Sequence, residues 1–226
     1  MKLYLDPGHG GTDPGASSNG LKEKNLTLKI ALKIRNLLKD YKNVAVKMSR
    51  TTDKTVSLGE RTNEANSWKA DYFLSIHINA FDGKANGYED FIFEDLSNSS
   101  KTAKLRNDMH DELKKLDFYN RGKKKQNFHV LRETKMSSIL TENGFIDNKE
   151  DAKKLKKDSF LDEIAEAHVK GLEKAFNLKK KENSDVQSNS NTFYRVVTGS
   201  FQDRKNAEQR VKDLKNKGFN SFIDIK

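Results

Sequence analysis

The alternation of short apolar runs with amphipathic stretches constrains the fold of this chain more than any other sequence feature. In the stretch over residues 24–39, Leu26, Ile30 and Ile34 recur at helical spacing. Short runs of apolar residues, typical of buried strands, lie between such stretches. This order predicts an α/β domain with a mixed, mostly parallel sheet flanked by helices. We expect strands over residues 2–5, 44–48, 72–78, 88–93, 128–131 and 138–140, and helices over residues 24–39, 58–69, 99–117 and 158–176.

A change of composition divides the chain into three parts. Residues 178–191 are rich in Ser, Asn and Lys and almost free of apolar residues, which predicts a flexible linker between residues 1–177 and residues 192–226. The last segment predicts one small β-α-β unit, with its helix near residues 203–218. Because so small a core rarely offsets the chain entropy lost on folding, we expect a second copy, a partner chain or the large domain to cover its open face.

The absence of cysteine narrows the possible chemistry. With no cysteine in the chain, disulfides and thiolate metal sites are excluded, and any metal must be held by His, Asp or Glu. No apolar run is long enough to predict a membrane-spanning helix. The N-terminus lacks a signal-peptide pattern, so we expect a chain synthesised in the cytoplasm that reaches an extracellular target only through lysis or a separate export route.

The net charge of +10 favours a polyanionic partner such as nucleic acid, acidic lipid or an anionic cell-wall polymer. A solvated lysine-rich surface explains the same charge equally well. The basic residues are spread out and are not interleaved with aromatic residues, as they are in nucleic-acid platforms. We therefore expect no nucleic-acid partner.

Two of the five histidines stand where strands are expected to end. His9 lies in a glycine-rich turn, LDPGHGGTDPGA, after the first strand, and His77 ends the run DYFLSIH. Because the carboxyl ends of strands form the crevice of an α/β sheet, these two imidazoles are placed to share one ion. His110, His129 and His168 lie within expected helices or a strand and are interpreted as ordinary packed residues.

Two glutamates are candidates for the remaining roles in such a site. A catalytic zinc site without cysteine commonly has a carboxylate as third ligand, and Glu23, at the start of the first long helix, is the candidate. The alternative is that Glu23 only complements the positive helix N-terminus. Glu142, which ends a short apolar strand, is a candidate general base for metal-assisted hydrolysis, or else a turn glutamate. The same ligand set also suits ferrous iron.

Several motifs in order resemble the zinc-dependent N-acetylmuramoyl-L-alanine amidases of the amidase-3 family, over residues 1–177. The resemblance is closest to bacillus-type autolysins and phage endolysins. It implies a phosphorylase/hydrolase-like α/β fold and one Zn²⁺ per chain, held by His9, Glu23 and His77, with Glu142 as the catalytic residue. It also implies cleavage of the amide between N-acetylmuramic acid and the L-alanine of the peptidoglycan stem peptide. The motifs are DPGHGGTDPGA, EKNLTLKIA, RTNEANSWKADYFLSIHINA, RGKKKQNFHVLRET and ILTENGFIDN.

The C-terminal segment YRVVTGSFQDRKNAEQRVKDLKNKGFNSFIDIK resembles one half of a SPOR-type repeat, a module that binds peptidoglycan glycan strands. Because a complete module has two such halves, the resemblance implies pairing of two chains into a homodimer through this unit. The expected partners are peptidoglycan and anionic wall polymers, met at the cell wall after release of the protein.

Two other functions remain open on the sequence. A non-catalytic peptidoglycan-binding or regulatory protein would use the same fold without a metal, although the presence of Glu142 disfavours it. Another zinc hydrolase of the wall, such as a peptidase or a deacetylase, would use the same chemistry on a different bond.

Overall fold

The computed structural model describes residues 1–181, 199–219 and 221–223. The chain divides into two compact units, residues 1–181 and residues 182–226. None of the helices in the described part of the chain is long and apolar enough to cross a membrane.

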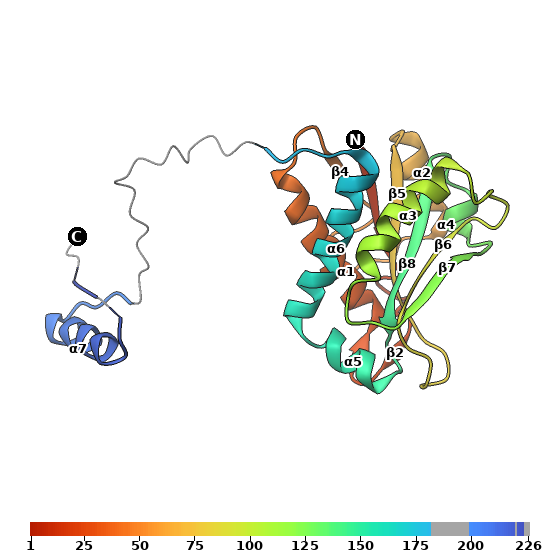
Figure 1. Ribbon diagram of the computed structural model, residues 1–226. Coiled ribbons are helices and arrows are strands. Elements are labelled where there is room, and N and C mark those ends of the chain that lie inside the picture. Colours follow the sequence, from red (N-terminus) through yellow and green to blue (C-terminus); the bar gives the residue numbers. More distant parts are fainter. Residues whose placement is uncertain (182–198, 220, 224–226) are drawn as a thin grey trace. The chain divides into compact units, whose positions relative to one another are not determined.

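The larger unit is built on a six-stranded sheet with strand order β4-β1-β5-β8-β6-β7 (Figure 1). The neighbours β4, β1, β5 and β8 are parallel, β6 is antiparallel to β8, and β7 is parallel to β6. The predicted mixed, mostly parallel sheet is therefore confirmed. A short hairpin, β2 (Ser17–Ser18) and β3 (Leu21–Lys22), lies outside this sheet. The six strands are β1 (Lys2–Pro7), β4 (Ala45–Met48), β5 (Tyr72–Asn79), β6 (Tyr88–Ile92), β7 (Asn120–Lys125) and β8 (Ser137–Phe145).

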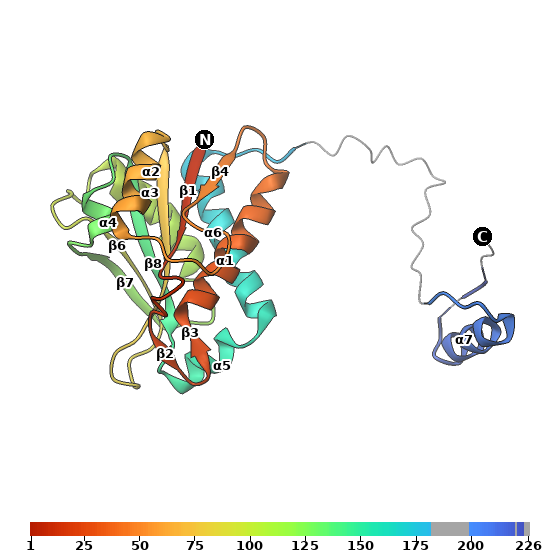
Figure 2. The same ribbon diagram turned by 180° about the vertical axis from the view of Figure 1, so that it is seen from behind.

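Helices cover the two faces of the sheet unequally (Figures 1 and 2). The long helices α1, α3 and α6 share one large hydrophobic core with one face, whereas α2 and α4 cover part of the other. A 3₁₀ turn (Leu38–Asp40) follows α1. The helices are α1 (Glu23–Leu37), α2 (Leu58–Ser67), α3 (Lys101–Leu113), α4 (His129–Arg132), α5 (Lys149–Leu155) and α6 (Asp158–Phe176).

The central strand β5 shows how this architecture positions polar side chains. Because successive side chains of a strand point to opposite faces, Leu74 and Ile76 enter the large core, while Phe73 packs into the smaller core with residues of α2 and α4. On the same face as Phe73, the following alternate positions are Ser75, His77 and Asn79. The face covered by α2 and α4 therefore changes from apolar to polar towards the carboxyl end of β5.

One expected strand is wrong. Residues 128–131 were expected to be extended, but His129–Arg132 form the short helix α4. Val130 and Leu131 are consecutive and both buried in the smaller core, an arrangement that one helical turn permits and that a strand, with alternating faces, opposes. The strand expected over 138–140 is longer, and Glu142 lies inside β8 rather than at its end.

The smaller unit contains one described helix, α7 (Arg204–Asn216). The Asp203 side chain caps it by accepting a hydrogen bond from the Lys205 backbone N–H at 2.7 Å, and Arg204 pairs with Glu208 at 2.7 Å. None of the described residues of α7 is buried. The first expected strand of the β-α-β unit lies mostly outside the described residues, and so do residues 220 and 224–226 of the second.

A buried histidine joins α6 to the sheet. His168 is fully buried, and its Nδ1 lies 2.8 Å from the Ile164 carbonyl oxygen and its Nε2 3.1 Å from Thr141 Oγ1. The neutral ring suits both partners, because Nδ1–H donates to the carbonyl while Nε2 accepts from the hydroxyl. Burial lowers the pKa of His168 to about 4, although the hydrogen bond to Ile164 opposes the shift.

The His168 pKa predicts acid sensitivity. The pKa of His168 is depressed from 6.5 in the folded chain, so the unfolded chain takes up a proton at a higher pH than the folded one. The contribution of neutral His168 to the free energy of unfolding is therefore complete above pH 6.5 and is lost as the pH falls towards 4. The shift corresponds to about 3 kcal/mol. Denaturant unfolding between pH 7 and pH 4 should therefore show a loss of stability about 3 kcal/mol larger in the wild type than in His168→Asn. Parallel stability profiles for the two proteins would contradict this assignment.

Candidate metal and active site

The structure brings His9, Glu23 and His77 together at the carboxyl ends of β1 and β5. Three potential ligand atoms, one from each residue, all lie within 4.8 Å of one another. His9 Nε2 is 3.1 Å from Glu23 Oε2, and His77 Nδ1 is 2.9 Å from Glu23 Oε1. The two imidazole rings meet edge to face with centroids 5.0 Å apart. The group therefore has the donor set and the spacing that a divalent metal ion requires.

His9 is oriented by its own turn. Its backbone takes a left-handed conformation, with φ of 62°, and its Nδ1 lies 2.8 Å from Asp13 Oδ2. A carboxylate on one ring nitrogen fixes the tautomer and directs the other nitrogen to a ligand. The orientation of His9 thus leaves Nε2 facing Glu23. The sequence contained this signal, because Asp13 follows His9 by four residues in the glycine-rich turn.

Two glycines allow the side chains to approach so closely. A Cβ atom on Gly8 would lie 2.2 Å from His77 Cε1, and one on Gly15 would lie 2.6 Å from Glu23 Oε2. Gly15 also has φ of 62°, a conformation that favours glycine. Gly8 and Gly15 therefore make room for His77 and Glu23, and Gly15 also supplies a left-handed backbone conformation.

Glu23 is the most buried member of the group. Its Oε2 accepts from the Ala16 backbone N–H at 2.9 Å, and its Oε1 accepts from the Ile78 backbone N–H at 3.1 Å. Burial opposes ionisation of this carboxyl, but hydrogen bonds and charge interactions with His77 and His9 outweigh it and hold the pKa well below its usual range. Glu23 is therefore an anion in a fixed position.

Two buried arginines hold the backbone that carries these residues. Arg50 donates from Nε to the Pro7 carbonyl at 3.1 Å and from Nη2 to the carbonyls of Gly8 at 2.9 Å and Lys24 at 2.8 Å. It thereby ties the His9 turn to the start of α1, next to Glu23. Sequence reasoning missed this role, since nothing in the composition separates a buried arginine from a surface one.

Arg61 of α2 acts on the other side of the same turn. It donates from Nη1 to Asp6 Oδ1 at 2.5 Å and to the Pro7 carbonyl at 2.9 Å, and from Nη2 to the His9 carbonyl at 2.9 Å. Asp6 in turn accepts from the Ser75 hydroxyl at 2.8 Å, which links β1 to β5. Arg61 was part of a motif quoted above, but its partners were not predictable from the sequence.

Glu142 lies beside this group. In the register of the sheet its Cα pairs with that of His77, so the two side chains emerge on the same face of neighbouring strands. Its Oε2 atom is buried and has no hydrogen-bond partner in the part of the chain that the structure describes. Burial raises the pKa of Glu142 well above its usual range, and the charges of Glu23 and Glu89 raise it further. Such a carboxyl is suited to proton transfer near neutral pH.

The other three histidines lie apart from this group. His110 Nδ1 is 2.6 Å from the buried Asp90, and His168 is a core residue of α6. His129 belongs to α4, not to a strand. Asn79, at the end of β5, donates from Nδ2 to Glu89 Oε1 at 2.8 Å.

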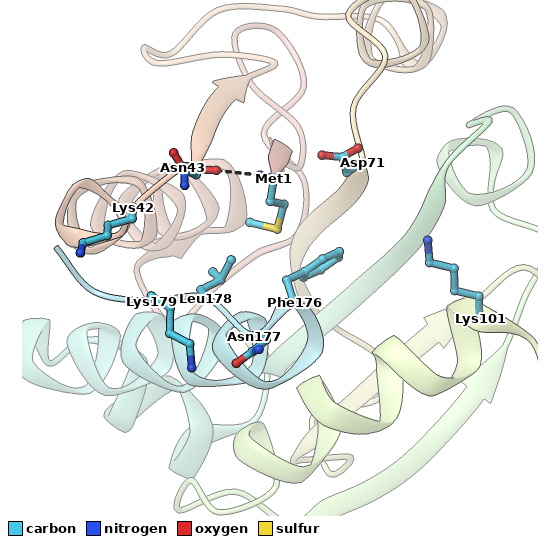
Figure 3. Close-up of a pocket in the computed structure, with 9 residues that line it drawn as sticks. All are labelled: Met1, Lys42, Asn43, Asp71, Lys101, Phe176, Asn177, Leu178 and Lys179. Carbon is cyan, nitrogen blue, oxygen red and sulfur yellow. Dashed lines mark hydrogen bonds between the residues drawn. The ribbon is translucent and has the colours of Figure 1, made fainter.

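A cavity of about 530 Å³ opens at the opposite end of the sheet, near Met1 and Asp71, which precede β1 and β5 (Figure 3). The side chains of Lys42, Lys101 and Lys179 stand apart around it and do not converge on one point. It brings together no His and carboxylate group of the kind found at the carboxyl ends of the strands. Among the residues that the structure describes, the group of His and carboxylate side chains able to hold a metal ion therefore lies at the carboxyl end of the sheet.

Comparison with known families agrees with this geometry. The profile of the Amidase_3 family, described as N-acetylmuramoyl-L-alanine amidase, matches residues 3–174. The chain belongs to this family. The amidase is thus a hydrolase that acts on peptidoglycan at the cell wall. A SPOR domain profile matches residues 165–224, beginning within α6 and therefore earlier than the half-repeat expected from the sequence.

Relatives from bacilli and a phage are similar over most of the chain. The amidase is 51% identical to N-acetylmuramoyl-L-alanine amidase CwlM of Bacillus licheniformis, over 99% of this chain and 84% of the relative. It is 47% identical to the sporulation-specific N-acetylmuramoyl-L-alanine amidase of Bacillus subtilis (strain 168), over 100% of this chain and 85% of that protein. It is also 45% identical to the endolysin of Bacillus phage SPP1, over 79% of this chain and 67% of the endolysin.

Solved amidase structures share the fold of the larger unit. The catalytic domain of CwlV, an N-acetylmuramoyl-L-alanine amidase from Bacillus (Paenibacillus) polymyxa var. colistinus, superposes with a TM-score of 0.74 at 30% identity, covering 79% of this chain and 99% of that domain. An N-acetylmuramoyl-L-alanine amidase from Clostridium difficile 630 gives a TM-score of 0.74 at 34% identity, covering 78% of this chain and 96% of its own. The α/β fold expected from the sequence is confirmed.

The close approach at Gly8 yields a prediction. In Gly8→Ala the new methyl group would collide with the His77 ring, so His77 moves and the affinity of the group for a divalent metal ion falls by about tenfold or more, as for other changes that disturb ligand orientation. Competition with a chromogenic chelator measures the affinity. The matched control is Gly59→Ala in α2, where the nearest atom to the new Cβ is 4.0 Å away. A metal affinity in Gly8→Ala equal to that of the wild type would refute this role of the glycine.

Proposed function

We propose that the amidase binds one Zn²⁺ through His9, Glu23 and His77 and hydrolyses the amide between N-acetylmuramic acid and the L-alanine of the stem peptide, with Glu142 transferring protons. The observation that carries the proposal is the convergence of two imidazoles on one buried, ionised glutamate. We also propose that residues 1–177 are the catalytic domain, that residues 178–191 are a linker and that residues 192–226 bind the wall.

The residues present fit zinc. Two imidazole nitrogens and one carboxylate form a known catalytic ligand set that leaves a further position open. The set also suits ferrous iron, but the family to which the chain belongs supports zinc. A zinc ion held there would supply a Lewis acid that makes water a better nucleophile near neutral pH and polarises the scissile carbonyl.

The side chains of the amidase supply the remaining chemistry. Glu142 stands next to His77 in the sheet with a buried oxygen that has no partner in the described part of the chain, so that oxygen is available to accept a proton from the attacking water. Its raised pKa then favours retention of the proton until the leaving amine of L-alanine takes it. No covalent intermediate is required by these residues.

The C-terminal unit and the basic charge support attachment to the wall. The SPOR match supports binding of peptidoglycan glycan strands, and we propose that two copies of the amidase pair through this unit as a homodimer. The net charge of +10 supports a general attraction to anionic wall polymers, which salt would weaken. We place the action of the amidase at the cell wall.

Replacement of Glu142 tests the assignment of the proton-transfer residue. Glu142→Gln keeps the shape of the side chain but cannot take up a proton, so the release of L-alanine amino groups from purified peptidoglycan should fall by about 100-fold or more. Zinc content should stay at one ion per chain, because Glu142 is not among the proposed ligands.

The control for this experiment is Glu150→Gln, an exposed glutamate of α5, which should retain wild-type activity. The amidase reaction frees amino groups without producing new reducing sugars, and product analysis should show this. A fully active Glu142→Gln variant would overturn the role of Glu142, and products with a different new end group would overturn the proposed bond.

A further inference from the structure

A cluster of charged side chains continues the site across the sheet. Glu89 of β6 lies opposite Glu142 in the antiparallel register, so its side chain emerges on the same face. Its carboxylate is buried and accepts hydrogen bonds from a residue of β5 and from two residues of β7. Asn79 donates to Oε1 at 2.8 Å, while Arg121 Nε and Lys124 Nζ of the edge strand β7 donate to Oε2 at 2.7 Å and 2.5 Å. A row of polar groups thus runs from His77 to β7.

The charges of this cluster do not cancel. One carboxylate, that of Glu89, is matched by two cations, so the group of three carries a net positive charge. Both cations remain accessible, since the side chain of Arg121 is 29% exposed and that of Lys124 is 38% exposed. One cation is enough to compensate the charge of a buried carboxylate, so the burial of Glu89 does not account for the second cation. The surplus charge therefore favours an anionic ligand.

The guanidinium of Arg121 is held in one orientation. Its Nε bonds to Glu89, its Nη1 lies 3.4 Å from the Asn86 carbonyl oxygen, and its Cζ lies 4.9 Å from the centroid of the Phe145 ring. An arginine fixed on three sides loses little side-chain entropy on binding, and its planar fork matches the two oxygens of a carboxylate. Lys124 adds a second positive charge at the same carboxylate.

We infer that Arg121, supported by Lys124, forms a subsite for a carboxylate of the stem peptide, a role that rests on the proposed function. Neighbouring strands lie about 5 Å apart, so a guanidinium bound to Glu89 is within about 10 Å of Glu142. An extended peptide spans this distance in about three residues. The subsite therefore binds a carboxylate within the first few residues after the scissile amide. It discriminates a free carboxylate from an amidated one.

Binding measurements in the Glu142→Gln background test this inference without hydrolysis. The probes are two synthetic muropeptides that differ only in the stem-peptide carboxylates, which are free in one and carboxamides in the other. Calorimetry should give a dissociation constant about tenfold or more lower for the free acid, because a charge-assisted hydrogen bond is lost on amidation. Adding Arg121→Gln should abolish this preference.

The matched control is Lys123→Gln, which removes an equal charge from the other face of β7, where the exposed Lys123 bonds to Asn107 of α3 at 2.9 Å. This variant should keep the preference, which separates a specific subsite from general attraction. Arg121→Lys preserves the charge beside Glu89 but lacks the fork, and it should reduce the preference.

Equal affinity for the two muropeptides in the Glu142→Gln chain would overturn the inference, and so would an undiminished preference in Arg121→Gln. The first of these outcomes does not depend on whether the arginine variant folds. The proposed function is tested separately: if it is wrong, the wild-type chain, which has Glu142, does not hydrolyse peptidoglycan.

Discussion

The site depends on one interaction, the buried carboxylate of Glu23 between the imidazoles of His9 and His77. An ionised carboxylate in this position is costly to bury, and the two rings and two backbone N–H groups offset that cost. The same arrangement leaves three ligand atoms facing one small volume. The burial of Glu23 and the positions of the three ligand atoms therefore both follow from this one interaction.

The hydrogen bonds around Glu23 explain why its carboxylate stays between the two imidazoles. Arg50 and Arg61 together bond carbonyls of the His9 turn and of the start of α1, so the segments that carry His9 and Glu23 are joined before any ion binds. Preorganisation of this kind reduces the reorganisation needed on metal binding. The polar end of β5 then places His77, and the register with β8 places Glu142 on the same face.

The sequence predicted the sheet and the long helices because their apolar residues recur with regular periods, as in α1. It failed where periodicity is absent. The edge strand β7, with the sequence NRGKKK, has no apolar residue, and the run at 128–131 is too short to separate a strand from the helical turn α4. The grouping of His9, Glu23 and His77 followed from strand ends and motifs, whereas the partners of Arg50 depend on tertiary contacts that no local pattern encodes.

The central claim is that one metal ion occupies the space between the two imidazoles and the early glutamate. Anomalous diffraction on crystals of the zinc-loaded amidase, recorded above and below the zinc absorption edge, tests this claim most directly. The account predicts a single strong peak in contact with His9, Glu23 and His77. A peak elsewhere in the molecule, or none between these side chains at full zinc loading, would contradict it.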